Sequence, residues 1–345
     1  MLFEDFKIIA KNLSNKNRYF NNKKILITGS LGFIGINFLK YFFYLSKNTK
    51  IKFNIVAIDN KKLDRNVKKI FKMKNFFYKK ADLNKINSFP KADYIIHAAS
   101  IASPLMYRKK ALQTIDSNVF LYKKILDFYK NKKLKSLLYF SSSEVYGNPD
   151  KKNIPTSENY NGNVSMIGPR SCYDESKRFG ETLSVYYHKI YNLPIKIVRP
   201  FNNYGPGLNL KDGRITADLF NSIINNKNIE IYSDGKSTRT YCYIADAIYG
   251  YLLALLSKYN AEPFNIGNHS PEISVNNLAK TCIKLSNFKK KIVFKINNDK
   301  EYNIDSPLRR CPNINKAKSK LGFKPFTKLE KGIIKTLNYY KSKKI

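Results

Sequence analysis

Residues 24–35 read Lys-Ile-Leu-Ile-Thr-Gly-Ser-Leu-Gly-Phe-Ile-Gly, and this segment predicts the fold of the chain. Its first half is an apolar run typical of a buried parallel strand. The second half is a turn with a glycine at every third position, and apolar residues then recur at helical spacing over 33–47. Strand, glycine turn and helix form the context of a dinucleotide-binding turn. Gly29 permits the tight turn, Gly32 lets the backbone approach a pyrophosphate, and Gly35 lets the helix pack close to the strand.

A second predicted strand, 53–58, ends at Asp59. A carboxylate at this point can accept hydrogen bonds from both ribose hydroxyls of an adenosine and repels a 2′-phosphate, which favours NAD. Lys61 and Lys62 follow and could neutralise a phosphate, so NADP stays open as the alternative. The pyrophosphate is expected at the N-terminus of helix 33–47, where free N–H groups attract anions.

The remaining pattern alternates strands and helices as far as Pro200. This alternation predicts an α/β fold of Rossmann type, a doubly wound parallel sheet, with a smaller C-terminal substrate-binding lobe. Further strands are expected at 76–78, 94–97, 136–140 and 195–198, and further helices at 107–130 and 172–191. We expect a helical N-terminal extension over 1–22, an NAD-binding Rossmann domain over 23–200 with a returning segment near 243–262, and a mainly substrate-binding lobe over 201–345.

Two segments carry the residue types of an oxidoreductase site. Residues 168–177 read Gly-Pro-Arg-Ser-Cys-Tyr-Asp-Glu-Ser-Lys, which places Tyr173 and Lys177 one turn apart on one helix face. A lysine ammonium beside a phenol favours the phenolate, so we expect a lowered pKa for Tyr173 and a role as general base. In the strand end 140–147, Ser142 can share a substrate hydroxyl proton, and Ser143 and Glu144 can orient a carboxylate or supply a proton.

Composition limits the class of protein. The chain has 345 residues and a formal net charge of +38, spread along its length as lysine, without an RNA-binding motif or zinc finger. We therefore expect no nucleic-acid partner, but attraction of an anionic substrate such as a nucleotide diphosphate. No apolar run reaches the ~18 residues of a membrane span, and the N-terminus is unlike a signal peptide. Four scattered cysteines indicate reduced thiols, a cytoplasmic location and no metal site.

Taken together, these segments resemble the extended short-chain dehydrogenase/reductases, in particular the NAD-dependent nucleotide-sugar epimerase/dehydratase family. The resemblance runs from about Lys23 to the C-terminus and is strongest to the decarboxylases of that family, which act on UDP-glucuronate. It is carried by Asp59-Asn60, by Ala-Ser-Pro at 102–104 with Tyr107, by the strand end 142–147, by 168–178, by Asp-Gly-Arg at 212–214, by Ser-Thr-Arg at 237–239 and by the segment 312–318.

The resemblance implies an NAD-dependent lyase that oxidises C4 of UDP-glucuronate, releases CO₂ from the 4-keto intermediate and forms UDP-xylose. It implies a homodimer held by the helices 107–130 and 172–191, and no membrane partner. The expected cofactor contacts are Gly29, Ser30, Gly32, Phe33, Ile34, Gly35, Asp59, Asn60, Asp82, Leu83, Ala98, Ala99, Lys177 and Arg199. The expected substrate contacts are Ser103, Tyr107, Asn118, Asn202, Arg214, Arg239 and Arg309.

Two departures keep other activities of the family open. Gln113 stands where the decarboxylases usually have lysine, and Gly207 stands where they usually have arginine. By resemblance, 4,6-dehydratases carry an Asp-Glu pair where this chain has Ser143-Glu144, and simple 4-epimerases usually lack the glutamate. A nucleotide-sugar 4,6-dehydratase or 4-epimerase is therefore the alternative, and a non-catalytic nucleotide-binding protein is the remote one.

Overall fold

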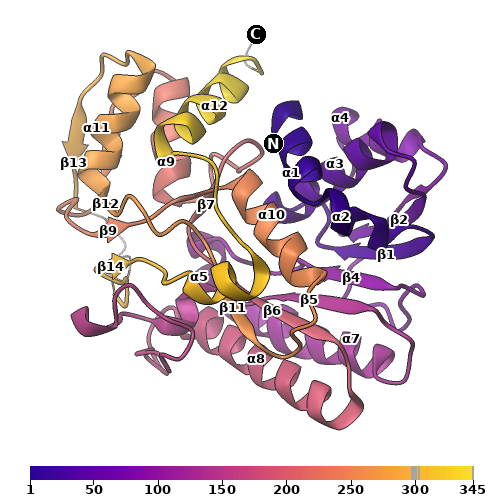
Figure 1. Ribbon diagram of the computed structural model, residues 1–345. Helices are drawn as coiled ribbons and strands as arrows, with labels where there is room; N and C mark the ends of the chain where they lie inside the picture. The colour runs from indigo at the N-terminus through magenta and orange to yellow at the C-terminus, as the bar shows by residue number, and fades with distance from the viewer. Residues whose placement is uncertain (297–300, 302–303, 344–345) are drawn as a thin grey trace.

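The computed structural model describes residues 1–296, 301 and 304–343. Within them, seven parallel strands form one central sheet in the order β11-β6-β5-β4-β1-β2-β3 (Figure 1). The strands are β1 Lys23–Thr28, β2 Phe53–Asp59, β3 Phe76–Lys80, β4 Tyr94–His97, β5 Ser136–Phe140, β6 Ile195–Pro200 and β11 Pro263–Ile266. The order reverses between β1 and β4, and open α/β sheets bind their ligands outside the carboxyl ends of the strands at such a switch point.

The central strands are mostly apolar because both faces of the sheet are covered, with lysines at the start of β1 and at the end of β3. In β1, Ile25 and Ile27 belong to one core cluster and Leu26 to the other, as the alternation of side chains along a strand requires. Thr28 pairs with Ile58 on one side and with His97 on the other. The carboxyl ends of the three central strands therefore lie level at one edge, directly before the glycine turn.

Helices cover both faces of the sheet (Figure 1). The helices α3 (Phe33–Asn48) and α10 (Ile244–Leu255) lie on one face, and α7 (Leu121–Tyr129) and α8 (Ser171–Tyr191) lie on the other (Figure 1). Every residue of α10 is buried, which is why its sequence is apolar on all sides. No helix in the described part of the chain has the length and hydropathy needed to cross a membrane.

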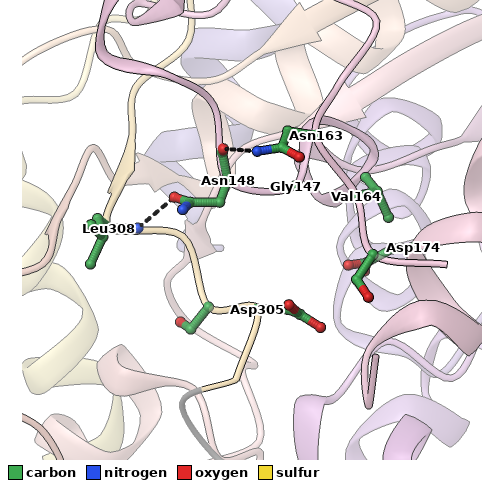
Figure 2. A pocket seen from close by; sticks show the side chains of 9 residues that line it. Gly147, Asn148, Asn163, Val164, Asp174, Asp305 and Leu308 are labelled. Carbon is green, nitrogen blue, oxygen red and sulfur yellow. Dashed lines mark hydrogen bonds between the residues drawn. The ribbon is translucent and has the colours of Figure 1, made fainter. Parts of the chain in front are cut away.

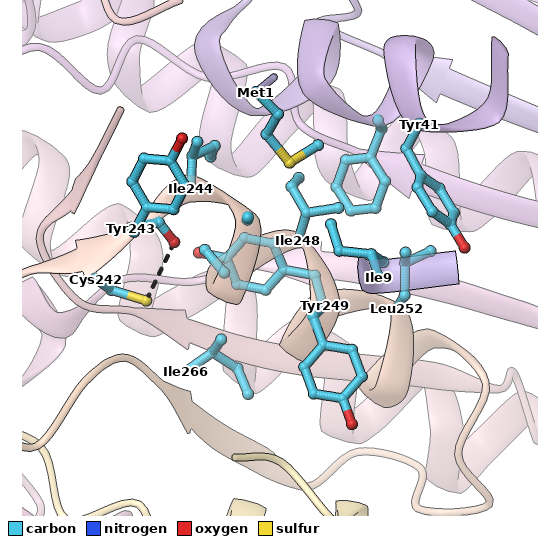
Figure 3. Packing of buried hydrophobic residues seen from close by; sticks show 14 of the residues in the cluster. Met1, Ile9, Tyr41, Cys242, Tyr243, Ile244, Ile248, Tyr249, Leu252 and Ile266 are labelled. Carbon is cyan, nitrogen blue, oxygen red and sulfur yellow. Dashed lines mark hydrogen bonds between the residues drawn. The ribbon is translucent and has the colours of Figure 1, made fainter. Parts of the chain in front are cut away.

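The first 20 residues form α1 (Phe3–Asn12), α2 (Ser14–Asn17) and one 3₁₀ turn (Arg18–Phe20). Ile9 lies among Tyr41 of α3 and Ile248 and Leu252 of α10 in the same buried cluster (Figure 3). Asp5 of α1 accepts hydrogen bonds from Tyr243 Oη at 2.8 Å and from Lys335 Nζ at 2.5 Å. The N-terminal segment is therefore packed between the sheet domain and the C-terminal helix.

The C-terminal half builds a smaller lobe and also returns to the sheet as α10 and β11. The lobe contains α9 (Ile215–Ile224), α11 (Val275–Ser286), α12 (Leu329–Lys341), the parallel pair β8 (Ile229–Ile231) and β13 (Ile292–Phe294), the pair β7 (Asn203–Tyr204) and β10 (Cys242–Tyr243), and the small sheet β12-β9-β14 (Ile273–Ser274, Thr238–Arg239, Arg309–Arg310). We propose the domain boundary near residue 200, where β6 ends.

One predicted helix is wrong. Residues 107–130 do not form one helix but α5 (Pro104–Lys109), α6 (Ala111–Ile115), a π-helical turn (Asp116–Phe120) and α7. Lys110 leaves the helical conformation, with φ −127° and ψ 49°. The π turn contains Asn118, whose buried amide bonds to two neighbouring segments, and such turns are frequent at functional sites.

Candidate active site

The glycine turn lies at the switch point and is packed against the end of β4. Gly29 has φ +65°, and a Cβ built there would lie 2.5 Å from Ala99 N and 2.6 Å from Ala98 C and O. A Cβ at Gly35 would lie 2.3 Å from Gly29 O, whereas the position at Gly32 meets nothing closer than 3.2 Å. The turn therefore needs glycine for close backbone packing, and it brings Ala98 and Ala99 to the place expected for cofactor contacts.

The glycine turn before α3 carries one buried hydroxyl that no described residue satisfies. Ser30 is fully buried, and its Oγ has no hydrogen-bond partner among the described residues. Phe33 and Ile34 form the first turn of α3 and are half-buried against the core. An unpartnered hydroxyl beside a helix N-terminus fits a phosphate oxygen, so this turn fits the pyrophosphate of NAD.

Asp59 lies at the end of β2 beside this turn. Its carboxylate accepts N–H bonds from Leu31 at 2.9 Å and Lys61 at 3.1 Å, which fixes its orientation. Lys61 thus contributes its backbone to holding the carboxylate in place. The other residues expected near the adenosine lie on loops at the same sheet edge: Asn60 is exposed, Asp82 accepts a bond from Asn84 N at 3.0 Å, and Leu83 is buried.

The structure brings Ser142, Tyr173 and Lys177 together at the end of β5. Tyr173 is hydrogen-bonded to the Ser142 hydroxyl, and the Lys177 ammonium lies 5.6 Å from the centre of the Tyr173 ring. Lys177 Nζ donates to Phe140 O at 2.9 Å. All three residues are at least nine-tenths buried, so a reacting hydroxyl placed against Ser142 and Tyr173 would be shielded from water.

The expected lowering of the Tyr173 pKa is wrong for this state of the protein. Burial raises the pKa of Tyr173 to about 12, and the hydrogen bond from Ser142 offsets only part of that effect. Burial also lowers the pKa of Lys177 to about 7, so the lysine is charged only part of the time near neutral pH. Spacing on a helix predicted the contact correctly, but removal from water outweighs the charge.

Glu144 is held between two arginines. Its carboxylate accepts hydrogen bonds from Arg170 Nη2 and from Arg310 Nη1, and Arg310 Nη2 donates to Glu144 Oε2 at 2.6 Å. Burial alone would raise the pKa of Glu144, but the two guanidinium groups lower it to about 2. Glu144 therefore stays ionised, and the prediction that it supplies a proton is wrong. Ser143 is buried at the start of the same 3₁₀ turn.

Sequence reasoning missed both arginines. Arg170 stands inside the quoted segment 168–177, three residues before Tyr173, and its guanidinium lies 5.8 Å from the centre of the Tyr107 ring. Tyr107 stacks on Tyr173 at 4.8 Å between ring centres. Arg309 was predicted in place of Arg310, but it pairs with Glu272 at 2.7 Å instead. Successive residues of β14 face opposite sides of the sheet, a distinction that the Arg-Arg pair in the sequence does not reveal.

Among the described residues, the guanidinium of Arg239 hydrogen-bonds to backbone carbonyl groups only. Its guanidinium donates to the carbonyl oxygens of Thr238 at 2.8 Å, Leu308 at 3.2 Å and Pro307 at 2.5 Å. Burial and the neighbouring Arg310 lower its pKa to about 10, which leaves it cationic at neutral pH. A partly exposed arginine with carbonyl partners only is suited to bind an anion, such as a diphosphate.

Two loops close over the candidate sugar side. Ser103 Oγ donates to Asp212 O at 2.8 Å, and Arg214 Nη2 donates to Ala102 O at 2.9 Å. Arg214 Nε also pairs with Asp212 at 3.0 Å. The charge of Arg214 opposes the rise in the pKa of Tyr173, so this loop lies near enough to Tyr173 to act on it electrostatically.

Three predicted contact residues are already engaged within the protein. Arg199 pairs with Glu181 at 2.6 Å and donates to Tyr146 Oη at 2.7 Å, and its expected cofactor contact stays a prediction. Asn118 is buried and bonds to Ser100 and to Ser176 of the helix that carries Tyr173, and its expected substrate contact likewise stays a prediction. Asn202 donates to Thr240 O at 2.8 Å and joins β6 to β10.

The sequence pattern of the NAD dependent epimerase/dehydratase family matches residues 25–267. Among curated relatives, UDP-glucuronic acid decarboxylase 6 of Arabidopsis thaliana is 35% identical over 93% of this chain and 90% of its own length. UDP-glucuronic acid decarboxylase 1 of Xenopus tropicalis is 33% identical over 96% of this chain and 74% of its own length. Among solved structures, UDP-glucuronic acid 4-epimerase of Bacillus cereus, in complex with UDP-glucuronic acid and NAD, has a TM-score of 0.77 and 26% identity, covering 92% of this chain and 99% of that one.

Proposed function

Because this chain belongs to the NAD-dependent epimerase/dehydratase family, we propose that it is an NAD-dependent lyase that converts UDP-glucuronate through a 4-keto intermediate to UDP-xylose. Curated relatives that match more than nine-tenths of the chain carry the name UDP-glucuronic acid decarboxylase. The free thiols of all four cysteines support a cytoplasmic location as part of the same proposal.

The observation that carries the proposal is the charge balance around Glu144. Arg170 and Arg310 bring two positive charges to one carboxylate, and Glu144 lies two residues after Ser142. Arg170 also contacts Asp174, whose pKa is raised to about 8, so at neutral pH the cluster has one positive charge in excess beside the candidate reacting centre. A buried excess charge calls for an anionic partner, and the C6 carboxylate of a hexuronate supplies one. A neutral hexose would leave that charge uncompensated.

The glycine turn, the unpartnered Ser30 hydroxyl and the oriented Asp59 carboxylate fit NAD, which these residues would hold by its pyrophosphate and its adenosine ribose. When bound, NAD supplies an acceptor for the hydride of C4, returns the hydride later in the same turnover, and brings a positively charged ring that favours the Tyr173 phenolate. Lys177 lies deeper than Tyr173 and would bind the ribose next to that ring.

Tyr173 and Ser142 transfer and hold the proton of the C4 hydroxyl. Tyr173 accepts the proton of the C4 hydroxyl, and Ser142 holds the same oxygen by a hydrogen bond. The resulting ketone is β to the C6 carboxylate, so breaking the C5–C6 bond moves an electron pair into an enolate. Arg170 and Arg310 position the carboxylate before it leaves, and the phenol of Tyr173 and the hydroxyl of Ser142 stabilise the oxygen at C4.

Incubation with UDP-glucuronate and NAD should release CO₂ and yield UDP-xylose. The physical reason is the ready loss of CO₂ from a β-keto acid once C4 is oxidised. Evolved ¹³CO₂ from labelled substrate and mass spectrometry of the nucleotide sugar check this result.

A second candidate function is 4-epimerisation. It is favoured by Gln113, which occupies the position where the decarboxylases usually have a lysine. Recovery of a C4 epimer with the carboxylate intact would replace the proposal by that candidate.

The purified protein should release NAD when it is denatured. The Asp59 carboxylate, fixed by two backbone N–H groups, can accept hydrogen bonds from an adenosine ribose and repels a 2′-phosphate. Chromatography of the released dinucleotide separates NAD from NADP. The variant Asp59→Asn keeps the shape and removes the charge, so its selectivity for NAD should fall. NADP as the main species in the unmodified protein would contradict the role given to Asp59.

We also propose a homodimer in which α8 and the segments of 104–129 pair across a two-fold axis. Large apolar side chains on these helices are at least half exposed: Leu112, Phe120, Phe179, Tyr186 and Ile190. A face of this kind is typical of an interaction surface. The arrangement would place two helical segments of each subunit in a four-helix bundle.

The double variant Phe179→Glu, Ile190→Glu should be monomeric, because two charges would have to be buried in the helix pairing. Sedimentation velocity of the unmodified and variant proteins checks the result. Phe294→Glu is the matched control, since Phe294 is also exposed but lies on β13 in the lobe. A monomer for the unmodified protein at micromolar concentration, or a dimer for the double variant, would exclude this pairing.

A further inference from the structure

The proposed reaction consumes a proton that its other steps do not provide. The C5–C6 bond breaks, CO₂ leaves without a proton, and the electron pair that remains at C5 must bind one. The hydride leaves and returns at C4, and the proton that Tyr173 takes from the C4 hydroxyl is given back, so both of these cancel. One proton per turnover therefore comes from solvent. Tyr173 only returns the proton that it took, and Glu144 stays ionised, so neither of them supplies this additional proton.

A cavity of about 440 Å³ lies beside Asp174 and next to Gly147, which ends the 3₁₀ turn that carries Glu144 (Figure 2). It is lined by Gly147, Asn148, Asn163, Val164, Ser165, Asp174, Asp305, Ser306 and Leu308. The carboxyl groups of Asp174 and Asp305 point toward one another across it (Figure 2). Asp174 directly follows Tyr173 in α8, so one helix carries both the proposed base and a carboxyl group of this cavity.

Asp174 is buried without a strong partner. It is 3% exposed, its Oδ1 has no hydrogen-bond partner among the described residues, and its Oδ2 lies 3.7 Å from Arg170 Nε. The opposite end of the Arg170 guanidinium contacts Glu144. Asp174 therefore lies one guanidinium group away from the cluster that we assign to the substrate carboxylate, and it faces the cavity on its other side.

Asp174 carries a proton at neutral pH. Burial, the Glu144 carboxylate and Asp305 raise its pKa, Arg170 and Arg310 oppose them, and the balance lies at about 8. The titratable or charged groups that face it are Glu144 from the 3₁₀ turn 143–146, Arg310 from β14, Asp305 from the segment before β14, Tyr107 from α5, and Arg170, Cys172 and Tyr173 at the start of α8. An acid of this strength can both give up a proton and regain one from water near neutral pH.

We propose that Asp174 is the residue through which the proton consumed by decarboxylation enters the site, from water in the cavity to the buried polar groups around Tyr173. This inference rests on the proposed function, since epimerisation and dehydration take up no net proton. Asp174 does not need to touch the sugar for this role. Its carboxyl group takes up a proton from water in the cavity and passes a proton to the buried polar groups of the substrate site.

The test compares turnover against pH for the unmodified enzyme and Asp174→Asn, with CO₂ release from UDP-glucuronate as the assay. For the unmodified enzyme, kcat should fall as pH rises through about 8, because Asp174 then loses the proton that it supplies. In Asp174→Asn, kcat should drop by about tenfold or more and the fall near that pH should disappear. Small weak acids, imidazolium and acetic acid, fit the cavity and should restore turnover in proportion to their protonated form. Rescue of this kind would not follow from a merely structural role.

Asp305→Asn provides a second variant that leaves Asp174 in place. Because the Asp305 charge raises the pKa of Asp174, its removal should move the fall in kcat to lower pH. If the fall in kcat stayed at the same pH in Asp305→Asn, Asp174 would not have the proposed role. The same conclusion would follow if Asp174→Asn kept the fall in kcat and weak acids did not restore its turnover. In either case, CO₂ release by the unmodified enzyme would still support the lyase. Absence of CO₂ release by the unmodified enzyme would remove both proposals.

Discussion

Replacing Tyr173 by phenylalanine should lower turnover of UDP-glucuronate by about 10²–10⁴-fold, the range typical of a lost general base. The phenol is hydrogen-bonded to Ser142, and its burial shields the reacting hydroxyl from water that could take its place. Phenylalanine keeps the stacking on Tyr107, whose ring centre lies 4.8 Å away. The loss should therefore appear in kcat, with little change in the amount of bound NAD.

Turnover is measured as CO₂ release, and bound NAD is measured by denaturing the variant and quantifying the released dinucleotide. Tyr107→Phe is the matched control, because it removes a buried hydroxyl that has no hydrogen-bond partner among the described residues. Its effect on kcat should be much smaller. If Tyr173→Phe turned over at nearly the unmodified rate, or if both variants lost the same amount, Tyr173 would not be the base.

Replacing Glu144 by glutamine should destabilise the protein by about 3–5 kcal/mol, the cost of removing one partner from a buried ion pair. The side chains of Glu144, Arg170 and Arg310 are 16%, 12% and 8% exposed. Glutamine leaves two buried guanidinium groups close together without a negative charge between them. Decarboxylation should fall with stability, because Arg170 and Arg310 lose the group that holds them in position.

The lowered pKa of Glu144 also makes the free energy of unfolding depend on pH. The folded-state pKa of Glu144, at about 2, lies below its ordinary value of 4.5, so the stabilisation is fully present above about pH 4.5 and is lost as pH falls towards about 2. In Glu144→Gln, the free energy of unfolding should not show the decrease that protonation of Glu144 causes between about pH 4.5 and about pH 2. Urea unfolding at neutral and at acid pH measures the difference.

Glu272→Gln is the control for an exposed pair. Glu272 pairs with Arg309 at 2.7 Å, but the two side chains are 21% and 40% exposed, and such pairs contribute about 0–1 kcal/mol. Equal losses of stability for Glu144→Gln and Glu272→Gln would show that the arginine cluster does not hold Glu144 as described.

The sequence by itself determined the features whose causes are local. The strands at 94–97 and 136–140 and the helix at 172–191 were predictable because an apolar run or a helical period is complete within its own segment. The glycine turn could be identified because steric contact at Gly29 and Gly35 involves backbone only a few residues away or at the next strand end. The pairing of Tyr173 with Lys177 followed from the geometry of one helical turn.

Only the tertiary structure decided the charges and partners at the site. Arg310 reaches Glu144 from 166 residues away along the chain, while Arg309 beside it turns to Glu272. No local pattern distinguishes these two arginines, because the small sheet that orients β14 is built from segments far apart in sequence. The protonation states of Glu144, Tyr173 and Asp174 are likewise set by burial and by charges on other elements. Desolvation and distant charges act through space, and the order of residues along the chain does not contain those distances.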